Sequence, residues 1–198
     1  MNLAVDLQEI VKKHAKHFVD TSGGRKALEG ISYREDGSIM ITDSTILLHL
    51  KNVHSLAEPV VKHYRTGRVI DEKYPNLNSI LNKQYPNDLK VDVRETVKYL
   101  DVLKASSVFS DFGELKDDLT FKVEDVMRQS FTLNLKGEIN GEFNPVCMKV
   151  SNLYKCFSVF RDLDEDNVNI RVAGSKIPLS FTDLNDRVEI IISPVWRR

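Results

Sequence analysis

The sequence predicts an α+β protein in which helices alternate with groups of antiparallel strands. Two observations lead to this fold class. Apolar residues recur at helical spacing in three separate segments, and short runs of alternating or contiguous apolar residues follow each of these segments. A unit of one helix plus strands therefore occurs three times along the 198 residues, which indicates internal pseudo-symmetry.

The first unit begins with a predicted helix over residues 6–19. Asp6 is suited to the N-cap and Glu9 follows three residues later, while the apolar stripe consists of Leu7, Ile10, Val11, His14 and Phe18. Residues 27–50 then alternate in ISYRE, turn at Asp36-Gly37, alternate again in SIMIT and continue through ILLHL. This pattern predicts three short antiparallel strands.

Residues 52–90 form the least regular part of the chain, because Pro59, Gly67, Pro75 and Pro86 interrupt it. A short helix is predicted at LNSIL. We place a domain boundary inside this stretch, with an N-terminal domain over residues 1–72 and a C-terminal domain over residues 73–198.

The second unit starts at Asp92, which can cap a helix over VRETVKYLDVLKASSVF, and continues with strands at LTFKVED and SFTLNLKGEI. In the third unit CMKV leads into a helix at SNLYKCFSVFRD, with Ser151 at the cap. The predicted strands NVNIRVAG, IPLSFTD and VEIIISPV follow it.

The composition is that of a globular protein, with 41% apolar and 29% charged residues. Lys and Arg number 28 against 29 Asp and Glu, so any nucleic-acid contact has to come from local clusters of charge. Cys147 and Cys156 fit buried thiols in a reducing compartment. No apolar run approaches the roughly 18 residues of a membrane span, and no signal peptide is apparent, so we expect a cytoplasmic protein without membrane contact.

The predicted helices carry basic residues outside their apolar stripes. These residues are Lys12, Lys13, Lys16, Arg94, Lys98, Lys104, Lys155 and Arg161. If the helices line one surface, their side chains form a basic face that suits the phosphates of double-stranded DNA without reading bases. Ordinary exposed helix faces also contain lysine, and Glu9, Glu95 and Asp101 share these faces, so both interpretations stay open.

The sequence provides no pattern typical of catalysis, of a metal site or of a cofactor. The acidic stretch DLDEDN at 162–167 has Asn167 where a calcium loop needs glycine and Ala173 where it needs glutamate. The histidines lack metal-ligand spacing, and SGGR at 22–25 stands outside any phosphate-loop motif. We therefore predict a protein that is not an enzyme and that binds no metal and no cofactor.

Three segments together resemble the bacterial sliding clamp, the β subunit of DNA polymerase III. The segment ALEGISYREDGSIMITDSTILLHL is similar to the clamp pattern that ends in Ala-Thr-Asp-Gly-His-Arg-Leu, with residues 41–47 reading ITDSTIL. EKYPNLNSIL resembles the clamp's Phe/Tyr-Pro-Asp segment, and the region from FNPVCMKV to IIISPVW resembles the clamp's last unit and its Met-Pro-Met ending. The resemblance implies a DNA-clamp-like fold with helices on one face and sheets on the other.

In this family, short apolar peptides of partner proteins dock into a pocket that these three motifs line. Carried over position by position, the resemblance implies a peptide-binding pocket at Thr42, Ser44, Thr45, Leu47, Pro75, Ile80, Ile192, Pro194 and Val195. Ser44, Thr45 and Ile46 stand where the family prefers Gly, His and Arg, which implies a different peptide preference.

The resemblance implies a sliding-clamp-like replication accessory protein, with the polymerase and the clamp loader as partners, duplex DNA as a non-specific ligand and a homo-oligomer as the assembly. Bacterial clamps have three domains of two units each, whereas this chain shows three units, so it resembles a shortened and divergent clamp, with a phage or a mobile element as a candidate source. The alternative is a monomeric clamp-like interaction protein that acts as a decoy or regulator of replication without encircling DNA.

Overall fold

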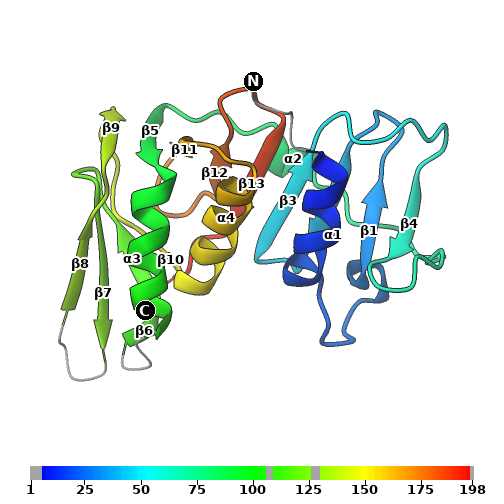
Figure 1. Cartoon of the computed structure of the whole chain (residues 1–198), viewed down its shortest axis with the longest axis horizontal. Coiled ribbons are helices and arrows are strands. Elements are labelled where there is room, and N and C mark those ends of the chain that lie inside the picture. Colours follow the sequence, from blue (N-terminus) through cyan, green and yellow to red (C-terminus); the bar gives the residue numbers. More distant parts are fainter. Residues whose placement is uncertain (1–5, 106–108, 126–129, 197–198) are drawn as a thin grey trace. The chain divides into compact units, whose positions relative to one another are not determined.

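The computed structural model describes residues 6–105, 109–125 and 130–196. The chain divides into two compact units, which are described separately (Figure 1). Unit 1 comprises Met1–Lys83 and Asn185–Ile190, and unit 2 comprises Gln84–Leu184 and Ile191–Arg198. Both units combine helices with antiparallel strands, so the predicted α+β class is confirmed. The division into clamp-like domains at residue 72 stays a prediction.

Unit 1 contains one long helix and a mainly antiparallel sheet. Its elements are α1 (Leu7–Phe18), the 3-10 helix η1 (Lys26–Glu29), β1 (Gly30–Tyr33), β2 (Ile39–Thr42), β3 (Ile46–Leu50), β4 (Val60–His63) and α2 (Asn78–Leu81). The first residues of β13 (Val188–Ile192) also belong to this unit. β1 pairs with β2 and with β4, and β2 pairs with β3. Lys51 N–H donates a hydrogen bond to Arg187 O at 2.9 Å, and this bond places the start of β13 beside β3.

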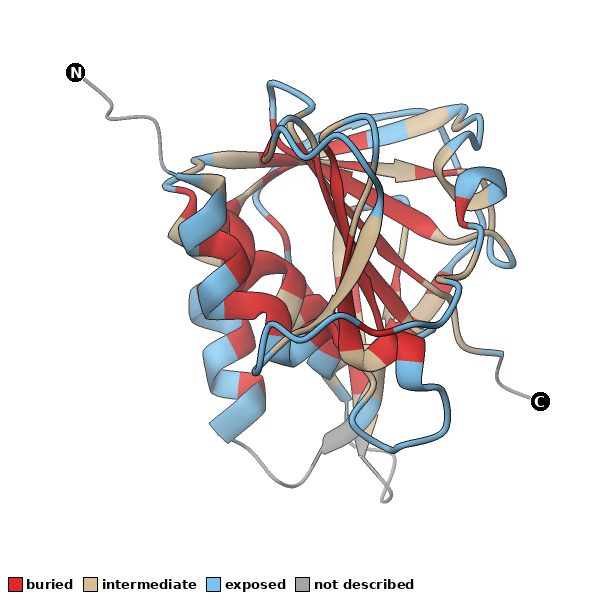
Figure 2. Ribbon diagram, turned by 90° about the vertical axis from the view of Figure 1, so that its right-hand side faces the viewer, coloured by how far each residue is buried: buried red, intermediate tan, exposed pale blue. Residues whose placement is uncertain are grey.

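The first helix has the predicted boundaries because its N-cap and its apolar stripe agree. Asp6 Oδ1 accepts a hydrogen bond from Gln8 N–H at 2.9 Å, and Ile10, Val11, His14 and Phe18 are buried. α1 lies over β2 and β3, and the buried positions follow one side of the helix (Figure 2). Since β2 and β3 are buried along their whole length, the strands predicted in residues 39–50 form the centre of this unit.

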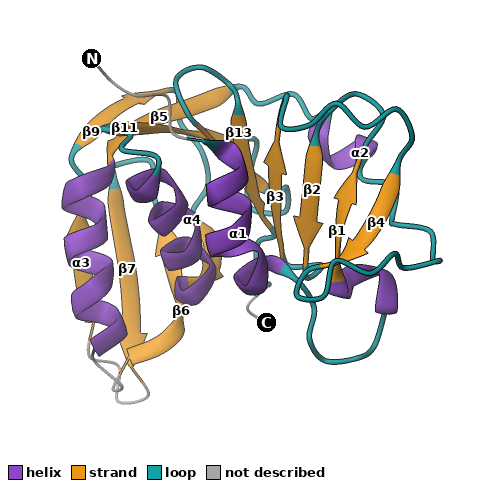
Figure 3. Cartoon of the chain, turned by 45° about the vertical axis from the view of Figure 1, so that its right-hand side comes forward, coloured by secondary structure: helices purple, strands orange, loops and turns teal. Residues whose placement is uncertain are grey.

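Unit 2 contains two long helices and two groups of strands. Its elements are β5 (Asn87–Asp92), α3 (Val93–Ala105), β6 (Phe109–Leu115), β7 (Thr120–Asp125), β8 (Ser130–Asn134), β9 (Gly137–Asn140), β10 (Val146–Lys149), α4 (Val150–Asp162), β11 (Asn167–Val172) and β12 (Leu179–Thr182). One group has the order β12-β11-β5-β9 and the other has the order β10-β6-β7-β8. α3 and α4 pack against each other, as Figure 3 shows.

The prediction of a single strand at SFTLNLKGEI was wrong. Ser130–Asn134 forms β8, which pairs with β7, whereas Gly137–Asn140 forms β9, which pairs with β5 in the other group of strands. Gly137 permits this change of sheet, because a Cβ atom there would collide with the carbonyl oxygen of Lys90. Local periodicity does not show which partner each half of the segment finds.

The predicted helix cap at Ser151 was also wrong. α4 begins at Val150, and Ser151 lies inside its first turn. Its backbone N–H and its hydroxyl each donate to the carboxylate of Asp111 at 3.1 Å, so a side chain from β6 satisfies this helix end. The helix predicted through Phe109 is described as far as Ala105, its predicted residues 106–108 lie outside the described residues, and Phe109 begins β6. Strands β4, β5 and β6 were not predicted.

Candidate functional site

The turn between β2 and β3 carries most of the pocket residues that the sequence predicts in unit 1. Asp43 Oδ1 accepts hydrogen bonds from Thr45 N–H at 2.8 Å, from the Thr45 hydroxyl at 2.7 Å and from Ile46 N–H at 3.0 Å. Ser44 has φ 78, a left-handed conformation that glycine adopts more readily, and its N–H donates to Thr42 Oγ1 at 3.0 Å. The short polar side chains therefore fix the turn from within.

Tyr74 connects this turn to the segment that contains Pro75 and Ile80. Its hydroxyl accepts a hydrogen bond from Thr42 N–H at 3.0 Å, so a residue next to Pro75 is fixed against the end of β2. Burial raises the pKa of the Tyr74 phenol, although the hydrogen bond from Thr42 acts in the opposite direction. The sequence analysis missed Tyr74, and its position directly before Pro75 in EKYPN is the signal that could have identified it.

The predicted pocket residues of unit 1 differ in how far a ligand can reach them. Thr42 and Leu47 are buried, with 5% and 4% of their surface exposed, so they support the site from below. Ser44 is exposed, and Thr45, Pro75 and Ile80 are half-buried. The surface that a ligand can reach here is therefore formed by the turn and by the segment around α2.

The C-terminal segment supplies the remaining predicted pocket residues and belongs to unit 2. Ile192 is buried in β13, whereas Pro194 and Val195 are half-buried. Val195 N–H donates to Cys147 O at 2.7 Å, which holds this segment against β10. Trp196 is 65% exposed and lies 4.8 Å beneath the Lys176 ammonium group. A groove that joins all nine predicted residues stays a prediction.

The predicted DNA-contacting residues lie on the outer faces of the three long helices. Lys12, Lys13 and Lys16 are exposed on α1, Arg94, Lys98 and Lys104 on α3, and Arg161 on α4, where Lys155 is half-buried. Several of these cations form ion pairs. The pairs are Lys12 with Glu9 at 2.6 Å, Lys98 with Glu95 at 2.9 Å, Arg94 with Asp166 at 3.3 Å and with Asp164 at 3.5 Å, and Arg161 with Asp162 at 3.4 Å. These acids reduce the positive potential of the helix faces.

The Lys104 side chain makes a different contact. Its ammonium group lies 4.2 Å from the centre of the Tyr154 ring, which joins α3 to α4. The hydrogen bond that Lys12 donates to Glu9 raises the pKa of Lys12, and the one that Lys98 donates to Glu95 raises the pKa of Lys98. Both amines are therefore fully charged at neutral pH.

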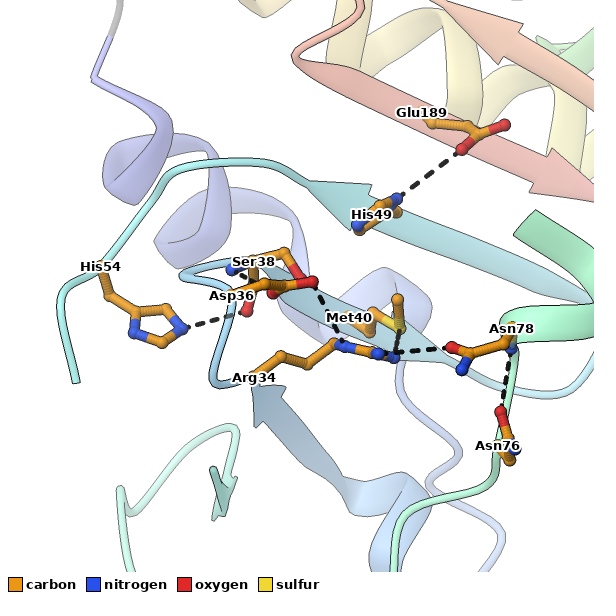
Figure 4. Close-up of polar contacts among 9 residues, drawn as sticks. All are labelled: Arg34, Asp36, Ser38, Met40, His49, His54, Asn76, Asn78 and Glu189. Atoms are coloured by element: carbon orange, nitrogen blue, oxygen red, sulfur yellow. Dashed lines mark hydrogen bonds and ion pairs between the residues drawn. The ribbon is translucent and has the colours of Figure 1, made fainter. Parts of the chain in front are cut away.

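A row of polar side chains crosses one face of the unit 1 sheet (Figure 4). Arg34, after the end of β1, donates to Met40 Sδ at 3.4 Å and to Asn78 Oδ1 at 3.3 Å, and its Nε lies 3.8 Å from Asp36 Oδ2. Burial acts to raise the pKa of Asp36, but hydrogen bonds from the hydroxyl and the N–H of Ser38 hold this pKa below its ordinary value. Arg34 thus ties β2 to the start of α2.

His49 and Glu189 extend this row to β13. Both side chains are almost completely buried, and His49 Nδ1 lies 3.6 Å from Glu189 Oε2. His49 is one of the histidines whose spacing does not suit a metal site, and the sequence analysis missed this pair. The signal that could have identified the pair is that His49 and Glu189 each interrupt an otherwise apolar strand.

The described part of the chain lacks two general features, a metal-binding cluster and a membrane-spanning helix. No group of three His, Cys, Asp or Glu side chains there is arranged to hold a metal ion. Among the same residues, no helix combines the length and the apolarity that crossing a bilayer requires.

Comparison with known proteins yields matches at the level of structure. No protein-family model and no curated protein sequence matches the chain. The DNA polymerase sliding clamp of Bacillus subtilis superimposes with a TM-score of 0.81 and 16% identity, over 98% of this chain and 63% of that one. The β subunit of Streptococcus pyogenes DNA polymerase superimposes with a TM-score of 0.78 and 11% identity, over 96% of this chain and 64% of that one. The Borrelia burgdorferi β subunit, solved with a natural product, superimposes with a TM-score of 0.79 and 14% identity, over 98% of this chain and 62% of that one.

The chain therefore has the fold of the bacterial DNA polymerase III β subunit, and the resemblance inferred from the sequence is confirmed at the level of fold. It spans less than two thirds of the length of these clamps. At 11–16% identity the likeness is one of fold.

Proposed function

We propose that this protein is a sliding-clamp-like replication accessory factor that binds short peptide motifs of replication proteins. The likeness in fold to solved sliding clamps carries the proposal, because it covers 98% of the chain. The turn at Thr42–Leu47 adds local support, since its residues occupy the motif that lines the peptide pocket in the family. The proposed partners are a polymerase and a clamp loader.

The chemistry of the turn and the C-terminal segment suits an extended apolar peptide. Ser44 and Thr45 offer polar groups beside the half-buried apolar surfaces of Pro75 and Ile80 in unit 1. Pro194 and Val195 offer a second apolar surface in unit 2. Apolar surface with a few polar groups at its rim is typical of sites that bind short linear motifs, in which one or two anchor residues supply most of the affinity.

The protein would act by tethering and not by catalysis. A protein that holds a polymerase by a peptide raises the effective concentration of that polymerase near DNA without any chemical step. Non-specific contact with duplex DNA through Lys12, Lys13, Lys16, Arg94, Lys98, Lys104, Lys155 and Arg161 would complete this role.

One observation favours the alternative, a monomeric clamp-like decoy or regulator that does not encircle DNA. Lys12, Lys98, Arg94 and Arg161 each form an ion pair with a nearby carboxylate, which weakens the field available to phosphates. Size-exclusion chromatography with light scattering distinguishes the two proposals. A closed oligomer with salt-dependent affinity for duplex DNA supports the clamp, and a monomer without this affinity supports the decoy.

Peptide binding is tested with a labelled clamp-binding peptide and paired variants. Ile80→Asp in unit 1 and Val195→Asp in unit 2 place a charge at half-buried predicted contacts, and we expect each to weaken binding at least about tenfold. Leu56→Asp and Leu184→Asp are the matched controls, because these leucines are 40% and 54% exposed in the same units. Equal affinity of all four variants and the native protein would refute the peptide site.

A further inference from the structure

Residues Val60–Ile70 form a hairpin that is basic, although positive and negative charges nearly cancel over the whole chain. We call it the basic hairpin. Four of the seven residues from Lys62 to Arg68 have basic side chains, namely Lys62, His63, Arg65 and Arg68, and no acid occurs between Val60 and Ile70. The whole chain has a net charge of −1. The hairpin is therefore a local source of positive potential in unit 1.

Backbone hydrogen bonds make the tip of the hairpin a defined turn. Ile70 N–H donates to Val61 O and His63 N–H to Arg68 O, both at 2.8 Å, and Gly67 N–H closes the turn on His63 O at 2.9 Å. Gly67 has φ 68, which suits glycine. The basic side chains are thus displayed from an ordered support on the edge of the sheet, next to β1.

The His63 ring takes part in this order. Its Nδ1 accepts hydrogen bonds from Arg65 N–H at 3.1 Å and from Thr66 N–H at 3.3 Å, so in the neutral ring the proton is on Nε2. Nε2 lies 3.8 Å from Glu29 Oε2. The Glu29 carboxylate lies beside His63, whereas Arg65 and Arg68 are exposed at the tip.

The Tyr64 ring contacts the side chains of both its neighbours in sequence. The rings of His63 and Tyr64 lie 5.1 Å apart with an interplanar angle of 23°, and the Arg65 guanidinium lies 5.5 Å from the centre of the Tyr64 ring. Arg65 also donates to the Tyr64 hydroxyl at 3.0 Å. Residues Arg65–Val69 are all exposed, with Val69 at 66%. The half-buried Tyr64 ring is thereby held beside cationic side chains next to the exposed tip.

We propose that the basic hairpin binds single-stranded nucleic acid, with Arg65 and Arg68 contacting phosphates and an unpaired base taking the place of the Arg65 guanidinium on the Tyr64 ring. Arginines that follow the backbone together with an aromatic platform are the combination that binds single strands without sequence preference. Duplex DNA satisfies only the phosphate contacts, because its bases are already stacked. This site is separate from the helix faces proposed above to contact duplex DNA.

The test measures fluorescence anisotropy of a labelled oligothymidine with the full-length protein. We expect the double variant Arg65→Ala/Arg68→Ala to weaken binding at least about tenfold and to reduce the slope of log K against log salt by about 1.4, or roughly 0.7 for each lost phosphate contact. The control double variant Lys73→Ala/Lys83→Ala removes two exposed charges of the same unit. It should bind as the native protein does.

The stacking contact has a test of its own. Tyr64→Ala should weaken binding between about fivefold and about a hundredfold, whereas Tyr64→Phe, which keeps the ring, should bind almost normally. An abasic oligonucleotide should bind the native protein and Tyr64→Ala equally. Circular dichroism of each variant verifies the fold.

Three results would overturn the proposal. They are no binding of oligothymidine by the native protein, an equal loss of affinity in the two double variants, and a Tyr64→Ala variant that still prefers the intact to the abasic oligonucleotide as strongly as the native protein does. The outcome is independent of the proposed replication role. Ile80→Asp and Val195→Asp test peptide binding, and Lys12→Ala/Lys16→Ala tests the duplex contact, while none of these changes alters the hairpin.

Discussion

His49 Nδ1 and Glu189 Oε2 lie 3.6 Å apart between two adjacent strands of unit 1, although 140 residues separate them in sequence. Both side chains are buried, and Met40 is opposite His49 in the register of β2 and β3. In such surroundings each of the two polar side chains is stabilised by the other more than by water. The start of β13 is thereby joined to β3 by side chains as well as by backbone.

This pair should show energetic coupling. In a double-mutant cycle with His49→Ala and Glu189→Ala, we expect a coupling free energy between about 0.5 and 3 kcal/mol, measured from urea unfolding at neutral pH. Each single variant leaves a buried polar group without its partner, and the double variant removes both. Additivity of the two single effects would show that the residues do not interact.

Loss of the Tyr74 hydroxyl should destabilise the turn that carries the predicted pocket. Tyr74→Phe removes the acceptor of Thr42 N–H, and leaving this backbone donor unpaired costs about 1–3 kcal/mol. Urea unfolding measures the effect. Tyr99→Phe is the control, since the Tyr99 side chain is 37% exposed on α3 and its loss of a hydroxyl should change stability little.

Ser44→Gly should stabilise the protein by about 1 kcal/mol. Ser44 has φ 78, and a side chain disfavours this left-handed conformation whereas glycine does not. Thermal and urea unfolding measure the gain. Ser55→Gly, at an exposed serine outside the positive-φ positions, should instead lower stability slightly through the greater freedom of the unfolded chain. Equal effects of the two substitutions would contradict the strain at Ser44.

Asp92 should contribute a pH-dependent part of the stability. The hydrogen bond from Glu95 N–H lowers the pKa of Asp92, burial opposes this, and Lys136 lowers it further. The contribution is fully present above the unfolded pKa, which is about 3.9, and is lost as the pH falls through the lower folded value.

Asp92→Asn keeps an oxygen acceptor but removes the charge. The difference in unfolding free energy between the native protein and this variant should be largest above about pH 4 and should shrink at lower pH. Urea unfolding between neutral and acidic pH provides the measurement. The exposed Asp117→Asn is the control, and a difference that stays constant with pH for Asp92→Asn would rule out this linkage.

Local chemistry in the sequence determined the first helix, the β2–β3 turn and the last helix. Asp6 followed by a stripe at helical spacing leaves one favourable arrangement for residues 7–18. Asp43 and Thr45 lie close enough in sequence to build their turn without help from the rest of the chain. Three such units in series were sufficient to predict the α+β class, whereas the clamp-like fold was implied by the resemblance of three segments to the bacterial clamp.

Tertiary structure decided the features that depend on partners distant in sequence. Strands β4, β5 and β6 contain few apolar residues, so neighbouring strands and not their own pattern define them. Asp111 replaces the predicted cap of α4, and Glu189 finds His49, because folding brings together groups whose separation leaves no local signal. A periodicity shows which face of an element is buried, whereas only the packed chain shows what covers that face.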